Sequence, residues 1–129
     1  MPIYQPIIPG RWSDRLTFSP AVVAGNLLFI SGTTATDEDL RLVGPGDIVA
    51  QTRRIFQIWQ PILAEAGAGF GNIVETTDYF LAATDYAGTA AVRREFFDPP
   101  YPAATGVRVA GLARPGALIE IKAVAVLSG

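Results

Sequence analysis

Residues 118–127, with the sequence LIEIKAVAVL, restrict the possible folds of this chain more than any other segment. In a β-strand, successive side chains point to opposite faces of the sheet. One face then carries Leu118, Glu120, Lys122, Val124 and Val126, and the other carries Ile119, Ile121, Ala123, Ala125 and Leu127. Both faces are mostly apolar, and such a strand is usually covered on both sides. We therefore predict a strand inside a sheet that has a covering layer on each face.

Glu120 is the only carboxylate in this strand. In partly desolvated surroundings its charged form is disfavoured unless another group pairs with it. One interpretation is a structural carboxylate that pairs with Lys122 or faces solvent at a sheet edge, because structural ion pairs also perturb carboxylates. The other interpretation is a general acid/base in a cleft. The residues alone leave both open.

The N-terminal residues 1–16 contain three prolines and Gly10. Proline cannot donate to a central β-ladder, so this segment is expected to be an irregular or edge-lying arm, with Trp12 as a candidate anchor. A first strand is expected to begin within residues 16–18.

Gly25 and Asn26 form a turn signal between two apolar runs, which predicts a hairpin into residues 27–30. The second strand of this hairpin is expected to end at Ser31 and Gly32. A glycine at this position allows a ligand or a neighbouring chain to approach the backbone closely. A plain strand end or a bulge is the alternative.

Further along the chain, helical periodicity appears over residues 47–67, with Asp47 as a good N-cap. The polar face of this helix, which includes Gln51, is expected to be solvated. Pro61 lies inside this pattern and should kink the helix or weaken its last turn. A strand over 73–83, a second helix over 85–97 and two final strands follow. This order predicts an α+β fold, with two helices packed on one face of a mixed sheet. The other face then needs cover, which an oligomer would supply.

The composition is consistent with one domain over residues 1–129 that assembles with copies of itself. Hydrophobic residues make up 50% of the chain and charged residues 17%, which is apolar for a small monomer. No run approaches the roughly 18 to 20 apolar residues that a membrane-spanning helix needs. The first 15 residues lack the pattern of a secretory signal, so we expect a cytoplasmic protein without a membrane partner.

Several classes of chemistry are excluded by residue types that are missing. The chain has no cysteine and no histidine, which removes thiolate nucleophiles, Ser-His-Asp triads and Cys/His zinc sites. No loop of the calcium-binding type is present, so a metal site is not expected. The net charge of −2, with ten basic residues scattered along the chain, makes nucleic acid an unfavourable partner.

Four segments together resemble the reactive intermediate deaminase (Rid) family, also called YjgF or endoribonuclease L-PSP. They are FSPAVVAGNLLFISG from residue 18, GDIVAQTRRIFQIWQPILAEAG from 46, IVETTDYFLAATDYAGTAAVRREFF from 73 and YPAATGVRVAGLARPGALIEIKAVAVL from 101. The resemblance implies a chorismate-mutase-like fold and a homotrimer whose intersubunit clefts bind small carboxylic acids. The family's archetype hydrolyses imines and enamines to a 2-oxo acid and ammonia without a cofactor.

The sequence departs from the archetype at three polar positions. Ala104 replaces the arginine that grips the substrate carboxylate, Phe18 replaces a tyrosine, and Ala90 stands where the family has an asparagine. Losing the arginine should cost a charge-assisted contact of about 1.5 to 3 kcal/mol. The altered pocket favours a neutral, bulkier or aromatic substrate, or one whose carboxylate is held elsewhere.

The resemblance retains Ser31, Gly32 and Thr105 as hydrogen-bonding positions, and Glu120 as the cleft carboxylate that orients or activates water. Phe18 completes the expected substrate-binding set. The leading hypothesis is a cofactor-independent hydrolase or deaminase acting on a small imine, enamine or related C–N substrate in an intersubunit cleft. The alternative is a non-catalytic trimer that binds a small metabolite as a sensor or partner protein. A ribonuclease fits poorly with the net charge and the missing histidine.

Overall fold

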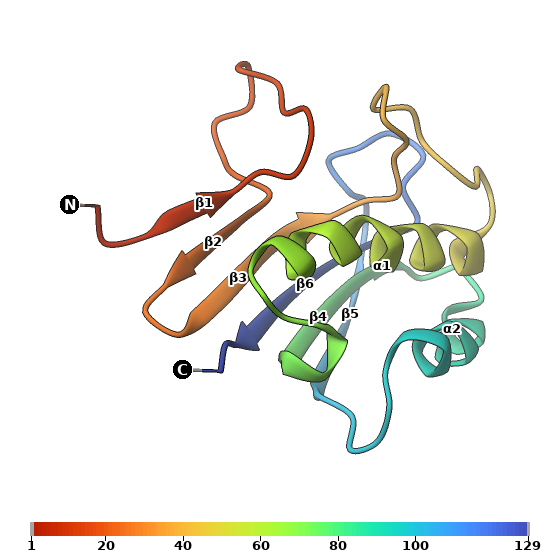
Figure 1. Ribbon diagram of the computed structural model, residues 1–129. Helices are drawn as coiled ribbons and strands as arrows, with labels where there is room; N and C mark the ends of the chain where they lie inside the picture. The colour runs from red at the N-terminus through yellow and green to blue at the C-terminus, as the bar shows by residue number, and fades with distance from the viewer. Residues whose placement is uncertain (1, 129) are drawn as a thin grey trace.

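A single mixed β-sheet organises the chain, and the computed structural model describes residues 2–128 of it. The sheet has six strands in the order β1-β2-β3-β6-β4-β5 (Figure 1). Neighbouring strands are antiparallel, except that β4 and β5 run parallel. The strands are β1 (Gln5–Ile7), β2 (Ala21–Ala24), β3 (Leu27–Thr33), β4 (Ile73–Leu81), β5 (Ala103–Val109) and β6 (Ile119–Val126).

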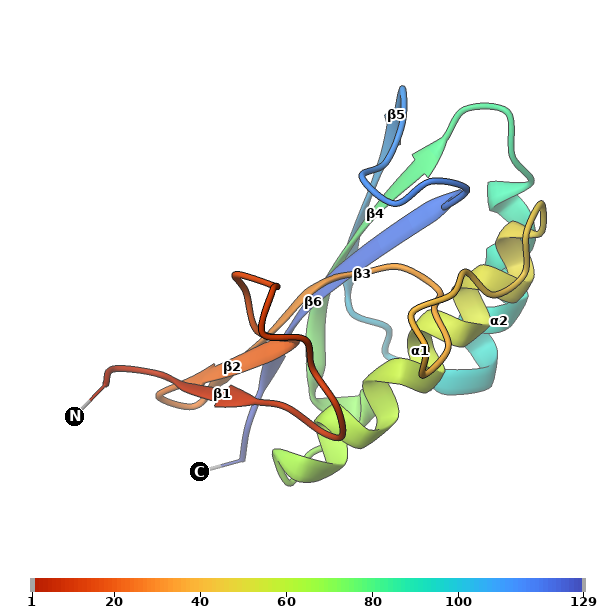
Figure 2. The same ribbon diagram turned by 90° about the horizontal axis from the view of Figure 1, so that it is seen from above.

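Both helices, α1 (Ile48–Glu65) and α2 (Thr89–Phe96), lie on one face of this sheet (Figure 2). Two short 3₁₀ turns, η1 (Phe70–Asn72) and η2 (Tyr86–Gly88), precede β4 and α2. The predicted α+β architecture with one helical layer is therefore confirmed. Met1 and Gly129, the two ends of the expected single domain, lie outside the described residues. None of the helices described is long and apolar enough to cross a membrane.

Strand β6 lies in the middle of the sheet between β3 and β4. Its residues Ile119, Ile121, Ala123 and Ala125 are buried on the helical side. On the opposite face, Glu120 and Val124 are half-buried, whereas Lys122 and Val126 are exposed. The helices thus supply one of the two covering layers that the sequence predicts, and the other face is open in a single chain.

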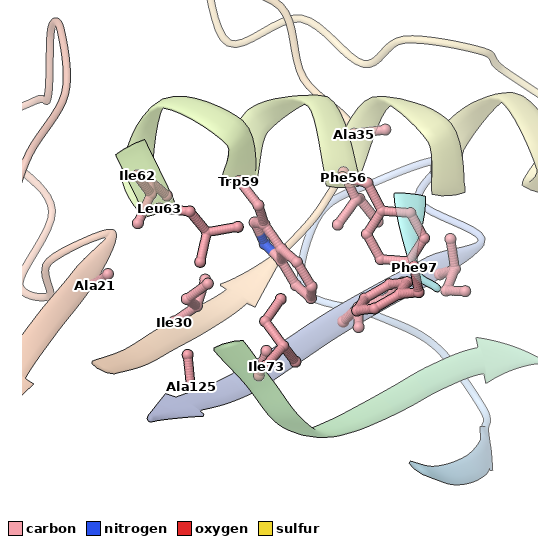
Figure 3. Packing of buried hydrophobic residues seen from close by; sticks show 14 of the residues in the cluster. Ala21, Ile30, Ala35, Phe56, Trp59, Ile62, Leu63, Ile73, Phe97 and Ala125 are labelled. Carbon is pink, nitrogen blue, oxygen red and sulfur yellow. The ribbon is translucent and has the colours of Figure 1, made fainter. Parts of the chain in front are cut away.

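The core forms where α1 packs on the sheet. Phe56 and Trp59 are fully buried and point from α1 toward the strands, where Ile30, Ile73 and Ala125 lie (Figure 3). Phe56 also contacts a cluster of aromatic rings with centroid separations of 5.3–6.1 Å, which comprises Phe70, Phe96 and Phe97. This packing fixes the helix against the sheet despite Pro61, and α1 continues past that residue to Glu65.

The helix begins as predicted, because the Asp47 carboxylate accepts a hydrogen bond of 3.0 Å from the amide of Ala50. The side chain of Gln51 is fully buried and connects α1 to the loop before β6. It donates to the carbonyl of Gly116 at 3.3 Å and accepts from the amide of Leu118 at 2.8 Å. Glutamine was expected on the solvated face of this helix, so its burial here is a correction.

The predicted start of the first strand at residues 16–18 is wrong. Leu16 instead closes a turn, in which its amide donates to the carbonyl of Ser13 at 3.1 Å, and residues 17 and 18 form a bend. The arm supplies a short edge strand instead, because β1 pairs with β2 and places Pro6 opposite Val22. Pro6 is tolerated there because an edge strand has one side without a partner.

A buried polar cluster joins β4 to α2. The Tyr86 hydroxyl donates to the Asp78 carboxylate at 2.6 Å, and the guanidinium of Arg93 pairs with the same oxygen. The Tyr86 ring also stacks on Phe80 with a centroid distance of 3.7 Å. Asp78 is 1% exposed, so these two partners compensate a carboxylate that is taken out of water.

Candidate functional site

A bulge in β3 places two of the predicted site residues. Ile30 pairs with Ala123 of β6, but Thr33 pairs with Ile121, so three residue steps on β3 match two on β6. The extra residue lies at Ser31 and Gly32, where the ladder is interrupted and the strand is re-aimed. The strand therefore continues through the position at which the sequence predicted its end.

Gly32 lies directly against the side chain of Glu120. A Cβ atom added at Gly32 would lie 2.2 Å from Glu120 Oε2 and 3.1 Å from Glu120 Cδ. Gly32 is not among the glycines with a left-handed backbone, so this position requires glycine for space and not for conformation. The carboxylate can occupy its place only because residue 32 has no side chain.

Ser31 fixes the bulge to the preceding turn. Its hydroxyl donates to the carbonyl of Ser19 at 2.6 Å, and its amide donates to the carbonyl of Pro20 at 3.0 Å. Both of its donors are thus used within the chain, and its hydroxyl oxygen is left as an acceptor. Thr33 continues the network, since its hydroxyl donates to the carbonyl of Ser31 at 2.8 Å and accepts from Trp59 Nε1 at 3.0 Å.

A cleft of about 640 Å³ opens where this bulge meets the loop before β6. The cleft is lined by Phe18, Ser31, Gly32, Thr34, Ala113, Arg114, Pro115 and Glu120. Four of the five residues predicted from the sequence therefore meet at one place. Thr105 is not among them, because it lies on β5 beside Thr77 of β4.

Phe18 forms an aromatic wall of the cleft and is 52% exposed. Its ring meets Trp12 edge-to-face, with centroids 5.4 Å apart, and Trp12 Nε1 donates to the Phe18 carbonyl at 2.8 Å. Trp12 thus anchors the arm as predicted. An exposed aromatic ring beside a carboxylate is suited to contact an apolar part of a ligand.

Glu120 has no ion-pair partner within 4.0 Å among residues 2–128. The ion pairs in this range are Arg11–Asp39, Arg53–Glu95 and Arg93–Asp78. The interpretation in which Lys122 neutralises Glu120 is therefore not supported. Across the ladder, Glu120 lies opposite Tyr79 of β4. A half-buried carboxylate without a paired cation is available to a ligand.

Arg114 is a cleft residue that the sequence reasoning missed. Its Nε donates to the Thr34 hydroxyl at 3.1 Å, and its Nη1 donates to the carbonyl of Leu40 at 3.1 Å. The guanidinium is thereby held between the loop after β3 and the loop before β6. Its place only six residues before Glu120, beside Pro115 and Gly116, was the available sequence signal.

Comparison with known proteins identifies the family. The model of the endoribonuclease L-PSP family matches residues 12–127. The chain belongs to this family, the Rid/YjgF family that the sequence resembles. A RutC family protein of Pyrococcus abyssi is 34% identical over 108 residues, which cover 84% of each chain.

Solved structures of the Rid/YjgF family share the fold over nearly the whole chain. RidA of the Antarctic bacterium Psychrobacter sp. PAMC 21119 has a TM-score of 0.81 and 28% identity, over 98% of this chain and 100% of that one. A YjgF/YER057c/UK114 family member from Mycobacterium tuberculosis has a TM-score of 0.80 and 28% identity, over 96% and 99% of the two chains.

Of the positions at which this chain departs from the Rid archetype, Phe18 lines the Glu120 cleft, whereas Ala104 does not. Ala104 is on β5 with Thr76 as its register partner, and Thr76 is fully buried on the helical side. Thr105 of β5 shares the open face of the sheet with Thr77 and Lys122, and two strands, β4 and β6, separate β5 from β3. Neither residue lines the Glu120 cleft of its own chain.

The described part of the chain holds no group of three or more aspartates and glutamates arranged for a metal ion. The absence of a metal and of a cofactor from the reaction remains a prediction. The groups gathered in the cleft are a carboxylate, a guanidinium, hydroxyl oxygens and an aromatic ring. These groups can orient water, transfer a proton and hold an anion.

Proposed function

We propose that this protein is a cofactor-independent hydrolase or deaminase that acts on a small imine, enamine or related C–N substrate. The observation that carries the proposal is Glu120, which lies in a 640 Å³ cleft against Gly32 without a cationic partner within 4.0 Å among the described residues. Membership of the Rid/YjgF family supports the same type of reaction.

In this reaction Glu120 acts as general base and then as general acid. As the water oxygen bonds to the imine carbon, the carboxylate of Glu120 takes one water proton and passes it to the imine nitrogen, which gives a neutral carbinolamine. Glu120 then takes the proton of the carbinolamine hydroxyl as C=O forms, and it transfers this proton to the amine nitrogen as the C–N bond breaks. Imine and water thus yield a carbonyl compound and ammonia.

The test is Glu120→Gln, which keeps the size of the side chain but removes its ability to accept a proton. The assay supplies freshly generated 2-imino acids and measures ammonia release, while circular dichroism checks the fold. We expect turnover to fall by about 10²- to 10⁴-fold, the usual contribution of a positioned acid/base. A folded Glu120→Gln protein with unchanged turnover would refute the role of Glu120.

We further propose that the active form is a homotrimer with its clefts between subunits. Val22, Phe29 and Val124 lie in one row across the open face of the sheet, and Phe29 is 41% exposed. Copies of the chain would cover this row and bring Thr105 of one subunit toward the Glu120 cleft of another. Light scattering should give the mass of three chains, and Phe29→Asp should shift it toward one; a monomeric wild type contradicts the model.

The alternative function is a non-catalytic trimer that binds a small metabolite. The observation in its favour is Ser31, whose hydroxyl and amide both donate within the chain and are not free for a substrate. Such a protein would bind 2-oxo or 2-imino acids but release no ammonia from any imine or enamine. In either case we propose a small-molecule partner in the cytoplasm and no role in binding nucleic acid, in line with the net charge of −2.

A further inference from the structure

We propose that Arg114 binds the carboxylate of the substrate, in the role that Ala104 cannot fill. The proposal rests on the proposed function for the reaction itself, but it concerns binding and can be tested without turnover. Of the substrates expected after the loss of the arginine at position 104, it favours one whose carboxylate is held elsewhere.

The surroundings of Arg114 favour an anionic ligand. The side chain is half-buried, and both of its hydrogen-bond acceptors, Thr34 Oγ1 and the Leu40 carbonyl, are neutral. No carboxylate of residues 2–128 lies within 4.0 Å of its guanidinium nitrogens. A partly desolvated cation without a counter-charge is unfavourable, and the planar guanidinium suits two-point binding of a carboxylate.

The two hydrogen bonds of Arg114 also orient it. Nε and Nη1 are occupied by Thr34 and Leu40, whereas Nη2 makes no hydrogen bond to the described residues. The guanidinium is therefore held in place before a ligand arrives, which reduces the side-chain conformational entropy that is lost on binding. A free N–H edge remains for an anion in the cleft.

Arg114 lines the same cleft as Glu120 without forming an ion pair with it. The two charged groups are thus more than 4.0 Å apart in a cleft of about 640 Å³. In a 2-imino acid the carboxylate carbon is bonded directly to the C=N carbon. A carboxylate held by Arg114 would thus place the C=N carbon between that residue and Glu120.

An apolar recess continues from this cleft. A cavity of about 150 Å³ shares Phe18, Gly32 and Arg114 with the cleft. Its apolar walls extend to Trp12, Leu16, Pro20, Leu40, Ile58 and Ile62. The hydroxyl-bearing residues Ser31, Thr33, Thr34 and Thr36 also line it, so the recess is apolar over most of its wall but not all of it. A cavity of about this volume is large enough for a benzene ring. The substrate class is therefore a carboxylate with an adjacent C=N group and a branched or aromatic side chain.

The experiment measures binding of 2-oxo acids, the product class, by isothermal titration calorimetry. The probes are 4-methyl-2-oxopentanoate, its methyl ester and pyruvate. The variants are Arg114→Gln, Arg114→Lys and, as a matched control, Arg94→Gln, which removes an equal charge from an exposed position of α2. Ile58→Phe tests the recess.

We expect Arg114→Gln to weaken binding of the acid by about ten- to a hundredfold and binding of the ester by less than about threefold. Arg114→Lys should restore part of the difference, Arg94→Gln should leave binding unchanged, and Ile58→Phe should weaken the branched acid more than pyruvate. A purely structural role of Arg114 would affect acid and ester alike, and that result overturns the proposal.

If Arg114→Gln does not fold, binding by the wild type still tests the proposal. Equal affinity of the wild type for the 2-oxo acid and for its methyl ester would refute a cationic residue that holds the carboxylate. If acid binding depends on Arg114 but no imine is ever hydrolysed, the anchor stands and the proposed function fails. If imines are hydrolysed with equal KM by the wild type and Arg114→Gln, the proposed function stands and the anchor fails.

Discussion

Replacing Gly32 by alanine offers the sharpest test of the candidate site, because it moves Glu120 without touching it chemically. The new Cβ would lie 2.2 Å from Glu120 Oε2, whereas ordinary contact begins at 3.4 Å. The carboxylate must therefore retreat by about 1.2 Å, since the Cβ atom is fixed by the backbone. The Glu120 carboxylate is the end of a flexible side chain and can make this movement.

The cost to stability should be small, and the cost to catalysis large. A strained rotamer costs about 0.5 to 1.5 kcal/mol. Alanine at a backbone position that it can adopt returns about 0.4 to 1 kcal/mol by restricting the unfolded chain. The free energy of unfolding should thus change by less than about 1 kcal/mol. A displacement of about 1 Å in a reacting group can lower the rate by about 10²-fold.

Ammonia release from fresh 2-imino acids gives kcat and KM, and urea denaturation gives the free energy of unfolding. Gly111→Ala is the matched control, because nothing lies within 4 Å of a Cβ atom there. Placed in a Glu120→Gln background, Gly32→Ala should cause little further loss, since its effect runs through the carboxylate. An active Gly32→Ala protein, or an equal loss in both backgrounds, would refute the assigned role of this contact.

Two further predictions concern stability. Burial, together with the hydrogen bond to Asp78, raises the pKa of Tyr86 to about 12, so the folded state favours the protonated phenol. The contribution of the protonated Tyr86 to the free energy of unfolding is complete below the unfolded pKa of about 10, and it is lost as the pH rises through the folded pKa. This decline of the free energy of unfolding at high pH should be smaller in Tyr86→Phe. At neutral pH, Tyr86→Phe should cost about 1.5 to 3 kcal/mol in urea denaturation, and an unchanged midpoint would contradict it. Asp47→Ala should cost about 1 kcal/mol by removing the N-cap of α1, whereas Asp47→Asn should retain most of it; equal losses would show that charge matters more than capping.

The elements that the sequence predicted well are those with a local cause. The turn at Gly25 has the positive φ of +60° that glycine favours, and it joins β2 to β3 as expected. Asp47 caps α1 with its own side chain, so four consecutive residues contain the whole signal. Alternation in β6 correctly separates the buried Ile121 from the half-buried Glu120, because a two-residue period is a property of the strand itself.

The predictions that failed depend on contacts between distant segments. Residues 16–18 have strand-like composition, but the edge position beside β2 is taken by β1 from earlier in the arm. Gln51 is buried because its amide bridges to Gly116 and Leu118, more than sixty residues away. Arg114 is held in the site by its hydrogen bonds to Thr34 and Leu40, and no periodic pattern in the sequence predicts these contacts.

The same distinction between local signals and contacts of distant segments applies to the site. In this fold, the cationic residue that binds a carboxylate can come from different sequence positions, whereas Glu120 cannot be replaced from elsewhere. Glu120 depends on the β3 bulge and on the missing side chain of Gly32, so its place is fixed by two strands at once. Arg114 lies on a loop, where substitutions disturb the core little. A loop can therefore supply the cationic side chain for a substrate carboxylate that position 104 on β5 lacks. If Arg114 binds the substrate carboxylate, proton transfer is set by the sheet and substrate choice by the loop before β6.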